Sequence, residues 1–213
     1  MPITEEVKLY GAAWSVYTRI ARLALEEKRV NYGLIEIDVF AETGVPQEYL
    51  KRHPFGRIPA FEHGDFCLYE TAAIVHYVDE AFPGCALLPA DPKARARANQ
   101  IVGILDAYAY RTLVWEIYVE SVVSIREGRL ADEQKIAAAL PRAAVCLSAL
   151  TRLSDDSEFL IGNSVTVADL YAAPIFACFT QAFEAVSLME GCEKLNRWWQ
   201  RFAIRDSMYR TQA

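Results

Sequence analysis

Apolar and polar residues alternate along the first part of the chain in patterns that predict two strands and a helix between them. Residues 7–10, Val-Lys-Leu-Tyr, predict a short strand. Apolar residues then recur at helical spacing over residues 15–28, which predicts a helix. Apolar and acidic residues alternate at positions 35–39, which is the periodicity of a second strand.

A predicted hairpin and a further helix complete this part of the chain. Residues 58–62 and 66–69 flank His63-Gly64-Asp65, a turn sequence between two strand-like segments. Apolar residues around positions 74–78 follow at helical spacing. The order β-α-β followed by β-β-α is that of the thioredoxin-like arrangement, a small mixed sheet covered by helices.

The second part of the chain has only helical patterns. Residues 82–92 are rich in proline and glycine and predict a linker. Residues 93–127 carry apolar groups at helical spacing without an internal proline, and Gly128 is a stop signal. Pro141 lies inside a second helical pattern, where it should kink the helix or begin a new one. We therefore expect an all-helical second domain.

The segment Thr166-Val167-Ala168-Asp169 has the sequence of a helix capping box. The Thr166 hydroxyl should accept from the Asp169 amide, and the Asp169 carboxylate should bind the Thr166 amide in return. Val165 and Leu170 occupy the two positions of a hydrophobic staple. Capping boxes are common, so this motif predicts a helix start and no function.

Composition restricts the class of protein. The chain has 213 residues, 53% hydrophobic and 23% charged, which suits a globular protein of two modest domains. The net charge is -6, and no basic stripe stands out beyond Lys93, Arg95 and Arg97. This balance argues against a nucleic-acid partner.

Three features predict a cytoplasmic protein without a membrane span. No apolar run approaches the ~18 residues that a bilayer requires. Residues 1–6 are acidic and lack the apolar core of a signal peptide, which argues against secretion. The cysteines are odd in number and scattered, which suits a reducing compartment, and we expect them to be small buried hydrophobes. They are Cys67, Cys85, Cys146, Cys178 and Cys192.

Three segments of the first part together resemble the glutathione-binding half of a glutathione transferase. They are the stretch from Tyr10 to Arg19, the stretch from Arg57 to Phe61, and Glu70-Thr71. Residues 162–170 resemble the folding signature of the helical domain in the same family, and Pro174 follows as it often does there. Each motif is moderately specific, but their order and spacing are strongly specific.

Within that family, the motif Tyr10-x4-Ser15-x3-Arg19 and the stretch from His53 to Phe61, His-Pro-Phe-Gly-Arg-Ile-Pro-Ala-Phe, are most similar to the phi class and its serine-type bacterial relatives. No cysteine lies between residues 11 and 19, which counts against the thiol-based classes and against a thioredoxin-type Cys-x-x-Cys. The resemblance implies an α/β thioredoxin-like domain over residues 1–83, a linker over 84–92 and an all-α domain over 93–213.

Ser15 begins the first predicted helix, and two roles are open from its position. Its hydroxyl could cap the helix by accepting from a free backbone amide. The resemblance implies instead the catalytic serine, which donates a hydrogen bond to the glutathione sulfur and favours the thiolate nucleophile. Tyr10 and Tyr17 are rival donors, although Tyr10 ends a strand and is expected to pack in the core.

The resemblance also implies how the tripeptide is held. Pro59 would follow a cis peptide bond, which leaves the backbone of Ile58 free to pair with the cysteinyl part of glutathione. Glu70 would contact the ligand's ammonium group. Thr71, where the family usually has serine, would bind the γ-glutamyl carboxylate at a helix N-terminus, the alternative being a simple cap.

One part of the family pattern is missing. Phi enzymes place a His-Lys pair near residues 41–48 to hold the glycine carboxylate of glutathione, whereas this chain has Gly44-Val45 there. Arg57, Lys51 and Arg52 are the possible substitutes, and Arg57 is nearest to the motif. The mode of binding at this end of the ligand stays open.

Aromatic residues suggest a pocket for the second substrate. Tyr108, Thr112 and Trp115 share one face of the long helix, a pattern usual for a core. The resemblance implies that they join Ala13 and Trp14 around an apolar electrophile. Phe55 would pack locally or insert into a second subunit. The three histidines lack metal-ligand spacing, so we expect no metal.

We therefore predict a cytoplasmic, homodimeric glutathione transferase that joins glutathione, as co-substrate, to a small hydrophobic electrophile through Ser15. No other cofactor is expected. Glutathione-dependent peroxidase or isomerase activity at the same site is one alternative. A non-catalytic ligand-binding protein of this fold is the other, and loss of the His-Lys pair favours it.

Overall fold

The computed structural model describes residues 5–213, which divide by their contacts into two compact units. One unit comprises the chain up to Leu87 together with Asp206–Ala213, and the other is Leu88–Arg205. The last eight residues thus associate with the first unit, although the sequence pattern grouped them with the helical domain. Residues 1–4, on which the argument against a signal peptide partly depends, lie outside the described residues.

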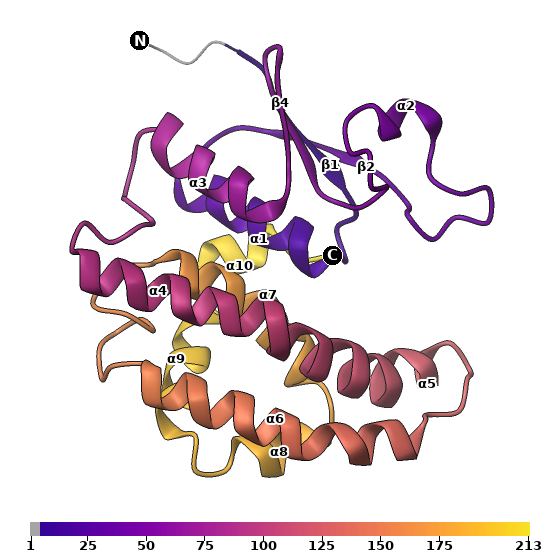
Figure 1. Cartoon of the computed structure of the whole chain (residues 1–213), viewed down its shortest axis with the longest axis vertical. Coiled ribbons are helices and arrows are strands. Elements are labelled where there is room, and N and C mark those ends of the chain that lie inside the picture. Colours follow the sequence, from indigo (N-terminus) through magenta and orange to yellow (C-terminus); the bar gives the residue numbers. More distant parts are fainter. Residues whose placement is uncertain (1–4) are drawn as a thin grey trace. The chain divides into compact units, whose positions relative to one another are not determined.

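A four-stranded mixed sheet forms the centre of the first unit (Figure 1). The strand order is β2-β1-β3-β4, with β1 and β2 parallel and the other neighbouring pairs antiparallel. The strands are β1 (Val7–Gly11), β2 (Gly33–Glu36), β3 (Ala60–His63) and β4 (Phe66–Tyr69). The predicted hairpin is confirmed, and Gly64 occupies its turn with a φ of 61°.

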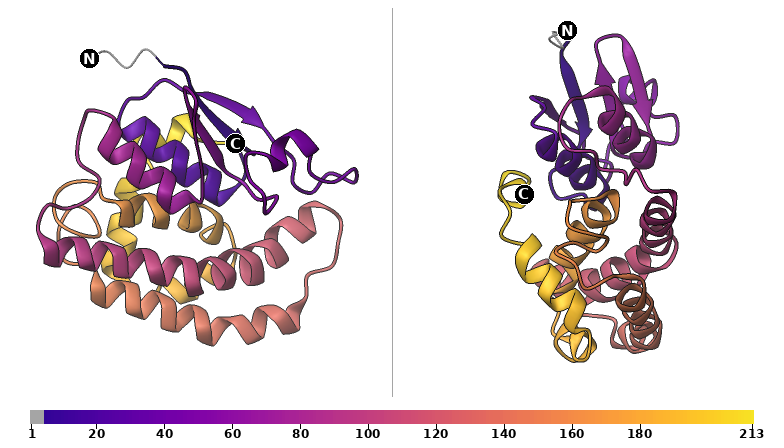
Figure 2. Two further views of the ribbon diagram at one scale, coloured as in Figure 1. Left: turned by 45° about the horizontal axis from the view of Figure 1, so that its top comes forward. Right: turned by 90° about the vertical axis from the view of Figure 1, so that its left-hand side faces the viewer.

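Helices cover both faces of this sheet. α1 (Val16–Glu27) and α3 (Thr71–Ala81) contact each other and lie on one face (Figure 2). The short α2 (Gln47–Leu50) brings Tyr49 against Tyr10 and Ala60 on the other face, where the three form a small buried cluster. The structure confirms the expected thioredoxin-like order.

The second strand is shorter than the periodicity suggests. β2 ends at Glu36, so Ile37 and Val39 lie outside it. Ile37 still donates its amide to the Gly11 carbonyl at 3.3 Å, but β1 ends there and offers no further partner. Strand length is set by the neighbouring strand, which the local pattern of β2 does not reveal.

The second unit consists of helices among the residues that the structure describes. Its helices are α4 (Pro92–Ile104), η1 (Leu105–Val123), α5 (Ser124–Arg126), α6 (Glu133–Leu153), α7 (Val167–Phe179), α8 (Glu184–Met189) and α9 (Glu193–Phe202). A short α10 (Asp206–Arg210) follows in the first unit. The fold is therefore that expected: a small α/β domain and an all-helical domain.

The long helix predicted over residues 93–127 is continuous from α4 through α5, but its middle part η1 is a π-helix. Gly128 ends it with a φ of 73°, in the left-handed region that favours glycine. Pro141 lies inside α6, which continues across it, so of the two alternatives predicted there, the start of a new helix is wrong.

The core of the second unit is α7, in which 11 of 13 residues are buried. The capping box at its start forms as predicted, and its carboxylate does more than cap. Asp169 is fully buried and accepts from the Leu160 amide, the Thr166 amide and hydroxyl, and the indole of Trp198, all at 2.8–2.9 Å. Burial raises the pKa of Asp169 to about 6, and the four donors oppose that rise.

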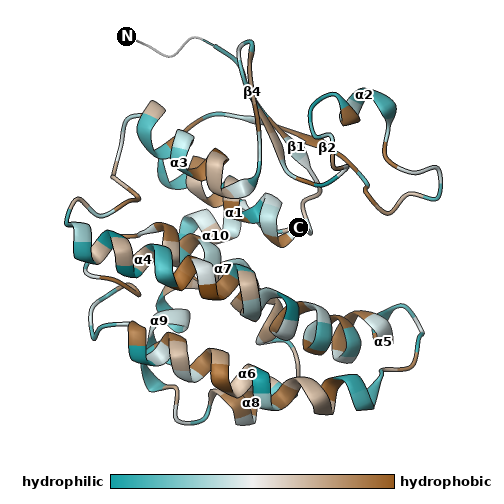
Figure 3. Cartoon of the chain, viewed as in Figure 1, coloured by the Kyte–Doolittle hydropathy of each residue, from teal (hydrophilic) through white to brown (hydrophobic). Residues whose placement is uncertain are grey.

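Among residues 5–213, one helix, α6, is long and apolar enough to cross a membrane by length and composition alone, which the sequence pattern did not indicate. Core helices of ordinary domains also pass this test. Apolar and polar residues alternate along α6 (Figure 3), and its Arg142 pairs with Glu116 of η1 at 2.7 Å. An ion pair to a neighbouring helix near the middle of α6 favours the role of a packed helix.

All five cysteines are free, and their surroundings differ from the expectation. Cys146 and Cys192 are buried, Cys178 is half-buried, and Cys67 and Cys85 are exposed. The expectation of burial is therefore wrong for the last two. Cys67 lies on β4, at the edge of the sheet, where only one neighbouring strand covers it.

Candidate active site

The strand register brings three predicted site segments to one end of the sheet. Tyr10 pairs with Ala60, and Ala60 pairs with Tyr69. The segment that follows β1 toward Ser15, the Ile58–Pro59 segment before β3, and the turn that follows β4 at Glu70 therefore leave the sheet at the same end.

Ser15 is the N-cap of α1. Its hydroxyl oxygen accepts from the Thr18 amide at 3.4 Å, and its own amide donates to the Ala12 carbonyl at 3.0 Å. The capping role is therefore present. It leaves the hydroxyl hydrogen of Ser15 able to donate to a ligand, because a hydroxyl can accept and donate at once. The side chain is 8% exposed.

The turn before Ser15 requires a glycine. Gly11 is the last residue of β1, and a β-carbon there would overlap Oγ1 of Thr18, which is fully buried on α1. This close approach seats the first turn of α1 directly against the end of β1. The position of Ser15 therefore follows from backbone packing that only glycine permits.

Tyr10 packs in the core, as the sequence suggested, and its hydroxyl is bound to another side chain. It is buried, and its hydroxyl donates to Oε2 of Glu62 at 2.6 Å. Burial, reinforced by Glu62, raises the pKa of the Tyr10 phenol, which makes it a poorer acid. Tyr17 is half-buried in the first turn of α1.

The peptide bond between Ile58 and Pro59 is cis, as the resemblance implied. Ladder pairing of β3 begins at Ala60, so Ile58 lies outside the sheet. The preceding residue is fixed through its backbone, because the Tyr49 hydroxyl donates to the Arg57 carbonyl at 2.6 Å. The Arg57 side chain is exposed.

The start of α3 has the features of an anion site. Glu70 is its N-cap and has a φ of 72°, a conformation that costs a non-glycine residue about 1–3 kcal/mol and tends to occur at ligand-binding positions. Thr71 is the first helical residue, so the alternative that it caps the helix is wrong. No side chain caps α3, which leaves its first amides available to an anion.

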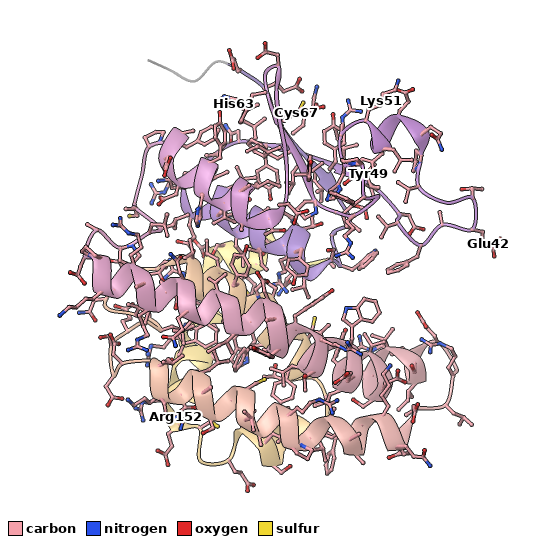
Figure 4. All side chains as sticks on the ribbon, in the orientation of Figure 1. Glu42, Tyr49, Lys51, His63, Cys67 and Arg152 are labelled. Carbon is pink, nitrogen blue, oxygen red and sulfur yellow. The ribbon has the colours of Figure 1, made fainter. Side chains whose placement is uncertain are left out.

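Of the three basic side chains that could hold the glycine carboxylate of glutathione, Arg52 and Lys51 have other partners. Arg52 donates to Glu62 at 2.6 Å, and its guanidinium lies 4.5 Å from the centre of the Tyr10 ring. Lys51 contacts both oxygens of Glu48 at 2.8 and 2.9 Å. Figure 4 shows Lys51 beside α2 and Glu42 at the outer end of the preceding loop. Residues 33–50 contain four acidic and no basic side chains.

The sequence did not indicate that His53 is buried beside Tyr69, at the end of β4. His53 is 2% exposed, its ring lies 4.9 Å from that of Tyr69, and its Nδ1 has no partner in the described structure. Burial lowers its pKa, while Glu70 raises it and Arg57 lowers it. Burial of the His53 ring therefore favours its neutral form. Phe55, 70% exposed, packs edge-on against it.

The residues assigned to the electrophile pocket come from both units. In the first unit, Trp14 is 51% exposed and stacks on Phe40 with centroids 5.5 Å apart, a partner that no pattern in the sequence indicated. Ala13 beside it is half-buried. In the second unit, Tyr108 and Trp115 are exposed, whereas Thr112 is buried within the unit.

Among residues 5–213, no group of three histidine, cysteine or acidic side chains is arranged to hold a metal ion.

Known families and structures match this chain over nearly its whole length. A family model of the glutathione S-transferase N-terminal domain matches residues 9–86, and one of the C-terminal domain matches residues 109–206. Glutathione S-transferase F12 of Arabidopsis thaliana is 28% identical over 203 residues, which are 94% of each chain.

Solved structures agree. Glutathione transferase F2 from Populus trichocarpa superimposes with a TM-score of 0.83 and 26% identity, covering 96% of each chain. A glutathione S-transferase I bound to lactoylglutathione has a TM-score of 0.84 and 24% identity, and covers 97% of this chain and 98% of its own. The chain belongs to the glutathione S-transferase family of enzymes and, within it, resembles the phi class.

Proposed function

We propose that this protein transfers the thiolate of glutathione to a small apolar electrophile, with Ser15 stabilising the thiolate. The observation that carries the proposal is the position of Ser15 as the N-cap of α1, at the same end of the sheet as Pro59 and Glu70. Glutathione is the co-substrate, and the reaction needs no further cofactor.

Ser15 acts on the acidity of the thiol. A free thiol with a pKa of about 8.5 is only about 3% ionised at pH 7. Lowering that pKa by ~2 units requires about 2.7 kcal/mol and ionises about three quarters of the thiol. A hydrogen bond from the Ser15 hydroxyl to a charged sulfur can contribute ~1.5–3 kcal/mol. The positive N-terminus of α1 adds about 0.3–1 kcal/mol.

The γ-glutamyl end of glutathione binds at the start of α3. Its carboxylate accepts from the amide and hydroxyl of Thr71, and its ammonium contacts Glu70. Support comes from the uncapped first turn of α3 and from the positive φ of Glu70. The cysteinyl backbone pairs with Ile58, which lies beyond the sheet ladder.

Arg57 holds the glycine carboxylate in place of the missing His-Lys pair. Arg52 and Lys51 already have carboxylate partners, whereas the Arg57 side chain is exposed directly before the cis-proline segment. His53 next to it adds no competing charge when neutral.

The electrophile is held by the remaining predicted residues. Ala13 and Trp14, the latter stacked on Phe40, form an apolar wall in the first unit. The residues of the second unit assigned to the electrophile are Tyr108 and Trp115, whose rings are exposed, and Thr112, which is buried.

The protein acts as a cytoplasmic homodimer without a nucleic-acid or membrane partner. Phe55, with 70% of its surface exposed in one chain, is the residue that would insert into a second copy. An aromatic ring of that exposure gains free energy when a partner subunit covers it.

Titration of bound glutathione tests the catalytic assignment. Ser15→Ala should raise the pKa of the bound thiol by about 1–2 units, measured by the ultraviolet absorbance of the thiolate. Turnover near pH 6.5 should fall roughly tenfold and recover partly at high pH, where the thiolate forms unaided. Tyr17→Phe is the matched control. A shift with Tyr17→Phe and none with Ser15→Ala would refute the assignment.

Two alternatives share the same site. Peroxidase or isomerase activity would use the same thiolate, and a turnover screen across aryl halides, enals, isothiocyanates and hydroperoxides separates these reactions. The acidic segment at residues 33–50 favours weak glutathione binding and hence a non-catalytic binding protein. Failure to bind immobilised glutathione would support that alternative.

A further inference from the structure

The segment Asp206–Ala213 packs along α1, the helix that begins at Ser15. Both belong to the first unit, and helix α10 lies against α1 (Figures 1 and 2). The hydrogen bonds between them join residues 180 to 192 positions apart in sequence, such as Ser207 and Glu27. This contact has no part in the function proposed above.

The middle of α1 is tied to this segment by Arg22. Its guanidinium is buried, at 7% exposure, and donates to the carbonyls of Thr211 and Arg210 at 3.0 and 2.9 Å. Its Nε donates to the Tyr32 hydroxyl at 3.2 Å. A buried guanidinium requires such acceptors, so the segment Asp206–Ala213 is an integral part of the packing around α1.

The first turn of α1 is tied to the segment by Arg19. Its Nη2 donates to the Met208 carbonyl at 3.0 Å, and its Nε donates to Oγ1 of Thr211 at 3.3 Å. The backbone amide of the same residue donates to the Ser15 carbonyl at 2.9 Å. Arg19 therefore links the helix turn that carries Ser15 directly to the segment.

Thr211 makes this attachment rigid. It is fully buried, and its hydroxyl donates to the Ser207 carbonyl at 2.8 Å while accepting from Arg19. At the other end of α1, the Ser207 hydroxyl donates to Glu27 at 2.6 Å. The segment thus holds α1 near both of its ends.

We propose that Asp206–Ala213 is a strap that fixes the first turn of α1, and that Arg19 is the positioning residue through which it aligns the Ser15 hydroxyl with the substrate sulfur. The inference rests on the proposed role of Ser15. The bond from the Thr18 amide to Ser15 is long, at 3.4 Å, so the hydroxyl depends on how the helix turn itself is placed. Hydrogen-bond strength falls quickly with misalignment, so a small shift of that turn weakens the bond to sulfur.

Two substitutions loosen the strap at its catalytic end without touching Ser15. Arg19→Gln removes the guanidinium that donates to Met208 and Thr211. Thr211→Val removes the hydroxyl that accepts from Arg19 and donates to Ser207, while keeping the side-chain shape. Each should raise the pKa of glutathione bound to the enzyme, by about 0.5–1 unit for Arg19→Gln, which corresponds to a roughly three- to tenfold loss of turnover at pH 6.5. Turnover near pH 9 should approach that of the unmodified enzyme, and the KM for glutathione should change less than twofold.

Two further variants separate positioning from charge and from stability. Arg19→Lys keeps the positive charge but cannot make both bonds, so it should behave like Arg19→Gln if position is what matters. Ser207→Ala removes the bond at the far end of α1, and it should lower the melting temperature without changing the thiol pKa.

The outcomes divide cleanly. An unchanged thiol pKa in both Arg19→Gln and Thr211→Val would overturn the strap proposal, and Thr211→Val decides alone if Arg19→Gln does not fold. A thiol pKa in Arg19→Lys equal to that of the unmodified enzyme would also overturn it, because the effect would then be one of charge. If the unmodified protein binds no glutathione, the proposed function fails first, and the strap proposal fails with it.

Discussion

Replacement of Asp169 tests how much its four buried hydrogen bonds contribute to the stability of the second unit. Oδ1 accepts from the Leu160 amide and the Trp198 indole, and Oδ2 accepts from the amide and hydroxyl of Thr166. The substitution Asp169→Asn keeps the shape of the side chain but replaces one acceptor oxygen with a donor.

The amide of the new side chain can be placed in two ways. With its NH₂ in the place of Oδ1, the two N–H groups of Leu160 and Trp198 would both lose their acceptor. With its NH₂ in the place of Oδ2, the Thr166 hydroxyl can turn and accept, so only the Thr166 amide is orphaned. The second arrangement is cheaper, and it still leaves one buried donor unpaired.

The cost follows from that arrangement. An orphaned buried donor costs about 1–3 kcal/mol, and two retained bonds lose the strength that a charged acceptor gave them, roughly 1 kcal/mol each. Burial of the charge, which raises the pKa of Asp169 to about 6, offsets part of this loss. We expect a net destabilisation of about 2–4 kcal/mol, which for a chain of this length lowers the melting temperature by about 4–16 °C.

Thermal unfolding followed by circular dichroism measures this difference. Asp156→Asn is the matched control, because Asp156 lies in the same unit, is 68% exposed and forms ion pairs with Arg197 and Lys194. Surface pairs contribute about 0–1 kcal/mol, so the control should melt close to the unmodified protein. A melting temperature for Asp169→Asn within 2 °C of the control would refute the reasoning.

Three further predictions concern the first unit. Gly11→Ala should destabilise the protein by about 1–3 kcal/mol in denaturant unfolding, because its β-carbon would overlap the buried Thr18; an unchanged midpoint would contradict the close approach. Thr71→Ala should weaken glutathione binding by about 1–3 kcal/mol in calorimetry, and equal affinity in a folded variant would remove Thr71 from the site. For the Glu62 carboxyl, burial raises the pKa, but bonds from Tyr10 and Arg52 outweigh burial and hold the pKa below 4.5. The stability that Glu62 contributes is therefore present above that pH and lost as the pH falls. The free energy of unfolding of Glu62→Gln should then fall less steeply at acid pH than that of the unmodified protein, and an equally steep fall in both would count against this network.

The sequence by itself determined those features that depend on neighbours along the chain. The strand–helix order of the first unit, the hairpin at Gly64 and the capping box at Thr166 follow from periodicity and turn chemistry. The position of Ser15 at a helix start after a strand could also be predicted, because a polar residue before an amphipathic segment is a local signal.

Only the tertiary structure decided which side chains are bound to other residues and which stay exposed to a ligand. Arg52 and Arg57 are both candidate cations near the cis-proline motif in the sequence, yet Arg52 is bound to Glu62 while the Arg57 side chain stays exposed. Helical spacing grouped Thr112 with Tyr108, but packing within the second unit buries the first and exposes the second.

The contacts of residues 206–213 are also decided by the tertiary structure alone. Nothing in the pattern of residues 206–213 indicates that Thr211 and Met208 receive hydrogen bonds from Arg19, since the partners are about 190 residues apart. Local periodicity encodes which face of an element is apolar. The partner that covers that face is selected by packing between distant segments, and the environment of Ser15 depends on that selection.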